Sequence, residues 1–143
     1  MKQLFLTLAL TAATSIAWAQ ASPVGLWKTI DDETKTEKSL VRITEQGGVL
    51  TGRIEKLFDA TKQDAKCEKC SDERKNQPVL GMTIVRNAKP DGDRKHWEGG
   101  EILDPNNGKV YRLRLKPLDG GKALEVRGYL GPFHRNQQWI RVE

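Results

Sequence analysis

A chain of 143 residues is long enough for one domain with a hydrophobic core of its own. Charged residues make up 30% of the chain and the formal net charge is +5, which is typical of a well-solvated globular protein. The basic residues are scattered among acidic ones without a Lys/Arg block, which argues against a nucleic-acid partner. A modest positive charge is instead compatible with an anionic surface.

The first 19 residues have the layout of a secretory signal peptide. Lys2 supplies a positive start, residues 4–16 are largely apolar, and Ala17-Trp18-Ala19 has the small-x-small pattern of a cleavage site. We expect cleavage after residue 19, or alternatively after residue 21, which leaves residues 20–143 as a single domain. The apolar run is too short to span a membrane, and no cysteine lies near the cut to carry a lipid. The sequence therefore predicts a periplasmic or secreted protein that is not a lipoprotein.

Short segments of alternating apolar and polar residues follow, and turn residues separate them. Eight strands are predicted, at residues 24–30, 39–45, 49–58, 83–86, 96–103, 110–116, 123–130 and 137–142. Most are joined by hairpin-length turns, which favours an all-β, eight-stranded antiparallel up-and-down barrel over a sandwich. Such a barrel is either filled by side chains or holds one small ligand. The charged outer face of the strands argues against a barrel that spans a membrane.

The connection at residues 59–78 is the one long loop of this pattern. It is polar and charged, carries both cysteines, and is expected to hold a short helical turn around residues 64–70. Cys67 and Cys70 are expected to form a disulfide, because an even pair in an oxidising compartment is usually oxidised. Catalytic CxxC pairs sit at a helix N-terminus in a βαβ setting, so a thiol–disulfide enzyme is a remote alternative.

No metal, cofactor or catalytic group is expected from the remaining residues. A zinc site would need two ligands besides the cysteines, and neither His96 nor His134 has partner spacing. No serine–histidine–aspartate set, carboxylate pair or phosphate-binding loop has supporting context. The sequence therefore predicts that the protein is not an enzyme.

Aromatic residues in strands are the candidates for a ligand cavity. Trp97, Tyr129 and Trp139 are the cavity candidates, although core packing is the more common role of buried indoles. Gly25 and Trp27 open the first strand, and their role is interpreted as structural.

Several segments resemble a known bacterial family. They are Gly25-Leu26-Trp27-Lys28-Thr29, Gly52-Arg53-Ile54, Trp97-Glu98-Gly99-Gly100-Glu101-Ile102-Leu103-Asp104-Pro105, Gly108-Lys109-Val110-Tyr111, Leu124-Glu125-Val126-Arg127-Gly128-Tyr129-Leu130-Gly131 and Gln138-Trp139-Ile140-Arg141-Val142. Together they resemble the envelope family known as domain of unknown function 2147. The resemblance implies an exported protein with a calycin-like or lipocalin-like barrel, and implies no established activity. It also implies that Gly25 and Trp27 lie at the floor of the barrel, because lipocalin-like barrels place there the tryptophan that closes it.

These features predict an exported protein that binds or carries a small apolar or amphipathic ligand. A second hypothesis is a barrel scaffold that docks an envelope protein or an anionic surface, through the 59–78 loop or a basic face. Arg112, Arg114 and Lys116 would form that face, because Leu113 and Leu115 alternate with them and are expected to point inward. If the basic residues pointed inward instead, the barrel would bind an acid through charge-assisted pairing.

Overall fold

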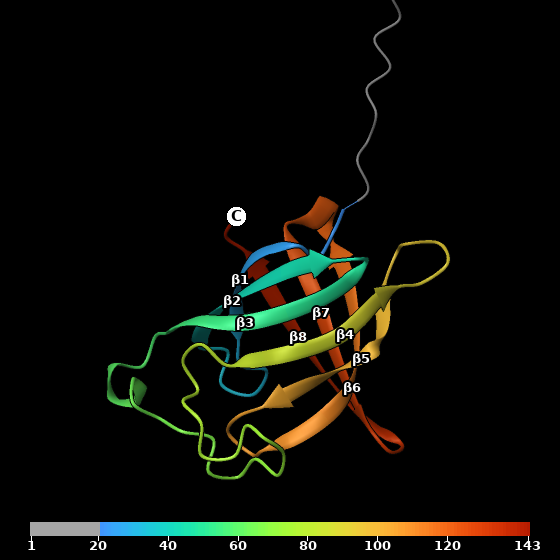
Figure 1. Cartoon of the computed structure of the whole chain (residues 1–143). Helices are drawn as coiled ribbons and strands as arrows, with labels where there is room; N and C mark the ends of the chain where they lie inside the picture. The colour runs from blue at the N-terminus through green and yellow to red at the C-terminus, as the bar shows by residue number, and fades with distance from the viewer. Residues whose placement is uncertain (1–20) are drawn as a thin grey trace, which may run out of the picture.

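A computed structural model describes residues 21–143, which form a closed barrel of eight antiparallel strands (Figure 1). Each strand pairs with the next in sequence, and β8 pairs with β1 to close the barrel. The strands are β1 (Gly25–Ile30), β2 (Glu37–Gln46), β3 (Val49–Leu57), β4 (Thr83–Pro90), β5 (Trp97–Asp104), β6 (Lys109–Leu118), β7 (Ala123–Leu130) and β8 (Phe133–Arg141). Two short 3-10 turns, η1 (Ala60–Lys62) and η2 (Asp119–Gly121), interrupt the connections. The predicted eight-stranded up-and-down barrel is confirmed, while the predicted signal peptide at residues 1–19 lies outside the described residues.

None of the helices in the described part of the chain has the length and apolar character needed to cross a membrane.

The boundary of β8 differs from the prediction. The sequence pattern placed the last strand at residues 137–142, but β8 begins at Phe133. Gly131 and Pro132 alone form the turn, because Leu130 and Phe133 pair directly across it and Gly131 has a positive φ of 57°. A glycine at the first central position is typical of a two-residue hairpin loop. The consequence is that Arg135 belongs to a strand and not to a loop.

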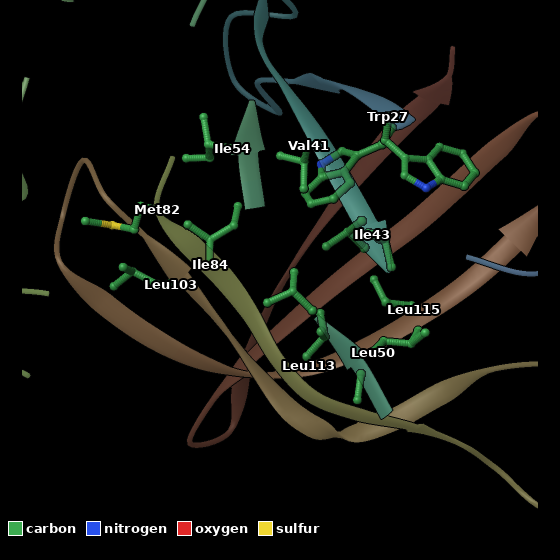
Figure 2. Packing of buried hydrophobic residues seen from close by; sticks show 14 of the residues in the cluster. Trp27, Val41, Ile43, Leu50, Ile54, Met82, Ile84, Leu103, Leu113 and Leu115 are labelled. Carbon is green, nitrogen blue, oxygen red and sulfur yellow. The ribbon is translucent and has the colours of Figure 1, made fainter. Parts of the chain in front are cut away.

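Period-two alternation separates the inner and outer faces of the barrel. In β6, Leu113 and Leu115 are fully buried, whereas Arg112 and Lys116 on the opposite face are exposed, as predicted. Figure 2 shows the inward-facing apolar side chains packed together in the barrel interior. The buried cluster includes Trp27, Val41, Ile43, Leu50, Leu113 and Leu115. This packing fills one part of the interior and fixes the barrel as a rigid frame.

The two ends of the barrel carry different connections, because successive strands run in opposite directions. The N- and C-terminal segments and the β2–β3, β4–β5 and β6–β7 connections lie at one end. The β1–β2, β3–β4, β5–β6 and β7–β8 connections lie at the other, which we call the mouth (Figure 1).

Trp27 closes the end opposite the mouth. Its side chain is fully buried, and its indole Nε1–H donates to the carbonyl oxygen of Pro23 at 2.7 Å. The guanidinium of Arg141 lies over the indole ring, 4.3 Å from its centroid. Gly25 lies at the same end, where a side chain would collide with Arg141 and the C-terminal carbonyl. These contacts give Trp27 and Gly25 a packing role at the closed end.

The long connection between β3 and β4 folds back onto the mouth. The backbone N–H of Cys67 donates to Gln77 at 2.9 Å, and that of Val79 donates to Ala65 at 2.9 Å. The prediction of a helical turn at residues 64–70 is wrong, because the helical turn of this loop is η1 at Ala60–Lys62. The Asp59 side chain caps η1 by accepting a hydrogen bond from the backbone N–H of Thr61. The segment that follows is instead held in an extended, hairpin-like path by these cross-loop bonds.

A buried arginine anchors this loop to the barrel wall. Arg74 is 4% exposed, and its guanidinium donates to both oxygens of Asp72 and, at 3.0 Å, to the carbonyl of Thr83 at the start of β4. It also lies 3.7 Å from Glu101 in β5. The hydrogen bonds from Arg74 hold the pKa of Asp72 at about 2. The loop is therefore a fixed part of the structure that is fastened to β4 and β5.

Candidate functional site

A cavity of about 200 Å³ lies inside the barrel at the mouth. Its deep wall is apolar and comes from several strands and from the β3–β4 loop. Ile54, Val79, Ile84, Ile102, Val126 and Trp139 are among the side chains that form this wall. The cavity therefore offers an apolar compartment next to the packed core.

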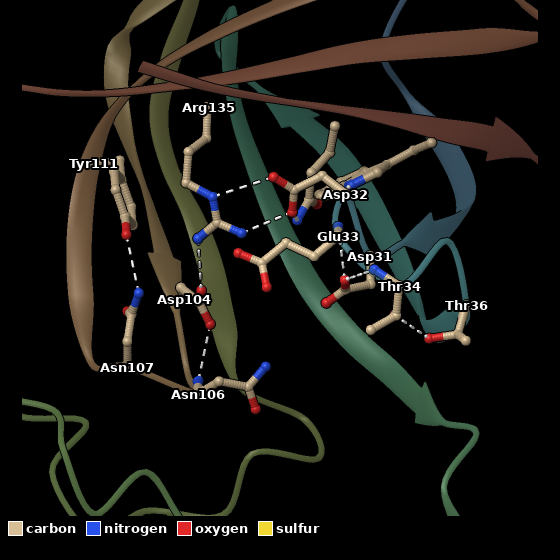
Figure 3. A network of polar contacts seen from close by, with 12 residues as sticks. Asp31, Asp32, Glu33, Thr34, Thr36, Asp104, Asn106, Asn107, Tyr111 and Arg135 are labelled. Atoms are coloured by element: carbon tan, nitrogen blue, oxygen red, sulfur yellow. Dashed lines mark hydrogen bonds and ion pairs between the residues drawn. The ribbon is translucent and has the colours of Figure 1, made fainter. Parts of the chain in front are cut away.

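Arg135 of β8 is the central polar group of the cavity. Its Nη2 donates to Oδ1 of Asp32 at 2.7 Å, and its Nε donates to Oδ2 at 3.3 Å. Its Nη1 donates to Asp104 at 3.4 Å, and Gln137 also donates to Asp32. Figure 3 shows that these groups come from the β1–β2 loop, the end of β5 and β8. One guanidinium thus ties together three segments of the mouth that are far apart in sequence.

This network shifts the ionisation of both partners toward the charged forms. The pKa of the Asp32 carboxyl lies below its usual value, chiefly because Arg135 donates hydrogen bonds to it. The pKa of the Arg135 guanidinium is raised, chiefly by Asp32 and to a smaller extent by the hydroxyl of Tyr111. Both groups are therefore fully charged at neutral pH.

Tyr111 fills the space beside Arg135. Its hydroxyl accepts a hydrogen bond from Asn107 at 3.0 Å (Figure 3). On β7, Gly128 pairs with Arg135 and leaves room for the tyrosine ring: a Cβ at this position would lie 2.9 Å from the Cβ of Tyr111. Because Gly128 has no side chain, the Tyr111 ring can line the cavity next to Arg135.

The two cysteines form the predicted disulfide, and the bond is buried. Cys67 is fully buried and Cys70 is 2% exposed, so both sulfurs belong to the packed interior. The bond packs against the β5–β6 turn: the Cys67 Sγ lies 3.6 Å from the Pro105 carbonyl, and a side chain at Gly108 would collide with the Lys69 backbone. Redox-active cysteines need an accessible sulfur. The disulfide thus closes a short turn within the loop, and this turn packs against the mouth.

The structure places one of the three aromatic cavity candidates in the cavity. Trp139 is buried in the cavity wall, with its Nε1–H donating to Gln137 at 3.0 Å. Trp97 begins β5 at the end away from the mouth and packs in the core, outside the cavity lining. Tyr129 alternates with the inward-facing Gly128 and therefore points outward, toward His134 and the guanidinium of Arg112. Trp97 thus lies outside the cavity because it packs in the core, and Tyr129 lies outside it because strand alternation points its side chain outward.

Arg135, Gln137 and Tyr111 were not among the predicted cavity residues. The predicted last strand begins at residue 137, so Gln137 falls within it, whereas Arg135 falls in the preceding turn, outside the alternation. Trp139, Gln137 and Arg135 share one face of β8 because they are spaced by two. Extending that alternation four residues toward the N-terminus would have identified both polar groups.

The basic face and the histidines lie outside the cavity. Arg112, Arg114 and Lys116 point outward, and Glu125 lies 3.4 Å from Arg114. Among the residues that the structure describes, Asp91, Asp93 and His96 form the one cluster with metal-ligand atoms. It lies on the exposed β4–β5 connection, where the His96 Nε2 is 2.8 Å from Oδ2 of Asp91.

A comparison with known families matches residues 25–141 to a family described as "Uncharacterized protein conserved in bacteria (DUF2147)". The chain belongs to this family. The match covers every strand of the barrel, including all residues of the Arg135 network. Among curated proteins, none matches this DUF2147 chain.

A similar solved structure is that of protein HP1028 from the human pathogen Helicobacter pylori, which is described as a member of the lipocalin family. The two chains share 19% sequence identity, with a TM-score of 0.72 over 86% of this chain and 84% of HP1028. At this identity the likeness establishes a lipocalin-like fold for the DUF2147 chain and leaves its ligand to be argued from its own residues.

Proposed function

We propose that this protein is an exported binding protein that holds one small amphipathic molecule in the mouth cavity. The observation that carries the proposal is a cavity of about 200 Å³ with an apolar deep wall and a polar mouth. A cavity that combines apolar lining with a few oriented polar groups is the usual form of a small-molecule site. The apolar part of the ligand would contact Val126 and Trp139, and its polar part would face Arg135 and the solvent.

The polar groups in the cavity favour binding over catalysis. Thr29 and Ser39, two hydroxyl side chains in the wall, hydrogen-bond to each other at 2.8 Å and not to a base. Arg135 and Asp32 are engaged with each other. A nucleophile needs an adjacent base within hydrogen-bond reach to be activated. The cavity groups are thus arranged to orient a ligand.

Export is supported by the signal-peptide layout of residues 1–19 and fits the disulfide between Cys67 and Cys70. We place the protein in the periplasm or outside the cell, where a soluble binding protein meets envelope-derived amphiphiles.

The test is an NMR titration of the mature protein with 1-octanol, a neutral single-chain probe. We expect saturable shifts at Ile54, Val126 and the Trp139 indole N–H. Replacing Val126 by Phe fills the cavity and should abolish these shifts, while Ile140→Phe on the outer face of β8 should not. Shifts that persist unchanged in Val126→Phe, or that never saturate, would contradict binding in this cavity.

A further inference from the structure

The tip of the β7–β8 hairpin carries apolar side chains that the barrel does not cover. Leu130 ends β7, Phe133 begins β8, and the two pair across the turn of Gly131 and Pro132. Leu130 is 44% exposed and Phe133 is 75% exposed, the largest exposed fraction among the large apolar side chains of residues 21–143. Figure 1 shows this hairpin projecting at the mouth end of the barrel. The tip is therefore a projecting apolar surface beside the mouth.

Strand alternation shows that the hairpin extends past the barrel wall. Leu130 is two residues from the inward-facing Gly128, and Phe133 is two residues from Arg135, so both belong to the inner faces of their strands. Deeper on the same face of β7, Val126 is buried. The inner face thus continues beyond the point where other strands cover it. Contiguous apolar surface of this kind marks an interaction site.

Side chains of increasing polarity follow the apolar tip along the hairpin. Tyr129 and His134 pair directly behind Leu130 and Phe133, and their ring centroids are 5.9 Å apart. The guanidinium of Arg112 in β6 lies 5.1 Å from the centroid of the Tyr129 ring. Apolar side chains, then amphipathic rings, then a guanidinium match the order of acyl chains, interface and phosphates in a bilayer.

The charges around the hairpin do not oppose a phosphate surface. The segment of residues 126–142 contains no aspartate or glutamate, and its basic side chains are Arg127, His134, Arg135 and Arg141. Just outside this segment, Glu125 lies 3.8 Å from Arg127, and Glu101 pairs with Arg112 across β5 and β6. These carboxylates nearly balance the outward arginines. We therefore expect apolar contact, and not charge, to supply most of the affinity for a partner.

We infer that the β7–β8 tip docks the protein on a phospholipid bilayer, with Leu130 and Phe133 inserted among the acyl chains and the mouth beside the lipid surface. A bilayer deforms around a projecting apolar hairpin, whereas a protein partner would need a matching pocket. Neither Leu130 nor Phe133 lines the mouth cavity. The inference therefore goes beyond the proposed function and does not depend on what the cavity binds.

The experiment measures co-sedimentation of the mature protein with vesicles of phosphatidylethanolamine and phosphatidylglycerol, and with vesicles of phosphatidylcholine. We expect saturable binding to both, with a small preference for the anionic vesicles. Leu130→Ser/Phe133→Ser should lower the partition coefficient about tenfold or more, because it removes the apolar surface that the bilayer buries. Both side chains are exposed, so this variant should keep its melting temperature. Ile140→Ser/Val142→Ser is the matched control, because these residues are 40% and 50% exposed near the other end of the barrel, and it should bind like the unaltered protein.

A tryptophan at the tip tests insertion separately from adhesion to the lipid surface. In vesicles with brominated acyl chains, the fluorescence of Phe133→Trp should be quenched, and the tryptophan of Ile140→Trp should not be. Binding that persists unchanged in Leu130→Ser/Phe133→Ser, or unquenched fluorescence of Phe133→Trp, would overturn the insertion of the tip. Absence of saturable binding to both kinds of vesicle would overturn membrane docking and leave the proposed function standing. Self-association that this double variant abolishes, without vesicle binding, would assign the tip to a second copy of the chain and overturn the inference.

Discussion

Replacing Arg135 by Gln should destabilise the mouth of the barrel. The substitution removes one short bond to Asp32 of 2.7 Å and two bonds of 3.3 and 3.4 Å, and leaves two half-buried carboxylates without their cation. A hydrogen bond to a charged group is worth about 1.5–3 kcal/mol, but the Arg135 side chain is 39% exposed, so solvent screening reduces this value. We expect the free energy of unfolding to fall by about 1.5 kcal/mol. For a domain of this size that corresponds to a melting temperature lower by about 6 °C, measured by circular dichroism.

A double-mutant cycle separates the Arg135–Asp32 interaction from other effects of the substitution. Asp32→Asn alone should destabilise the protein by a similar amount, and Asp32→Asn/Arg135→Gln should cost clearly less than the sum of the two. Strict additivity would refute the view that these residues form one network.

The cost of Arg135→Gln should also depend on pH. The folded state lowers the pKa of Asp32, so the stabilisation from its charge is fully present above the unfolded value of about 3.8 and is lost as the pH falls through the lower, folded value. The difference between Arg135→Gln and the unaltered protein should therefore be largest at neutral pH and shrink below about pH 3.8. A difference that stays constant down to strongly acidic pH would show that the charge of Asp32 is not involved.

Two further predictions concern the disulfide and the leader. The double variant Cys67→Ser/Cys70→Ser should lose only about 2 kcal/mol of stability, because a bond that closes a very short loop stabilises a protein modestly. The variant should keep the circular dichroism spectrum of the β-barrel. An unchanged melting temperature would show that the bond does not stabilise the protein. Expression of the full chain in a bacterial host should yield envelope protein whose intact mass corresponds to cleavage after residue 19, or after residue 21, and an uncleaved cytoplasmic product would contradict export.

The strands could be predicted from the sequence because strand alternation is a local signal. Leu113 and Leu115 alternate with Arg112 and Arg114, and two glycines, Gly47 and Gly48, form the hairpin turn that joins β2 to β3. The disulfide could also be predicted, since only two cysteines are present and they are three positions apart.

The cavity residues could not be predicted in the same way, because a cavity depends on contacts between distant segments. Arg135 meets Asp32, which is 103 positions away in the sequence, only after β8 pairs with β1 and closes the barrel. Trp97 and Trp139 are both buried strand residues, yet only Trp139 lines the mouth cavity. Which buried aromatic residue lines the cavity is set by the tilt and register of the closed barrel, and neither can be read from local alternation.

The proposed function requires that the mouth cavity holds the apolar chain of a ligand. Isotope-filtered nuclear Overhauser spectra of the protein with bound octanol test it most directly, because they report which protons of the protein lie close to the probe. We expect contacts from the terminal methyl group of octanol to Val126 and to the Trp139 indole. Contacts confined to residues outside the cavity, for example to Ile140 or Phe133, would contradict it.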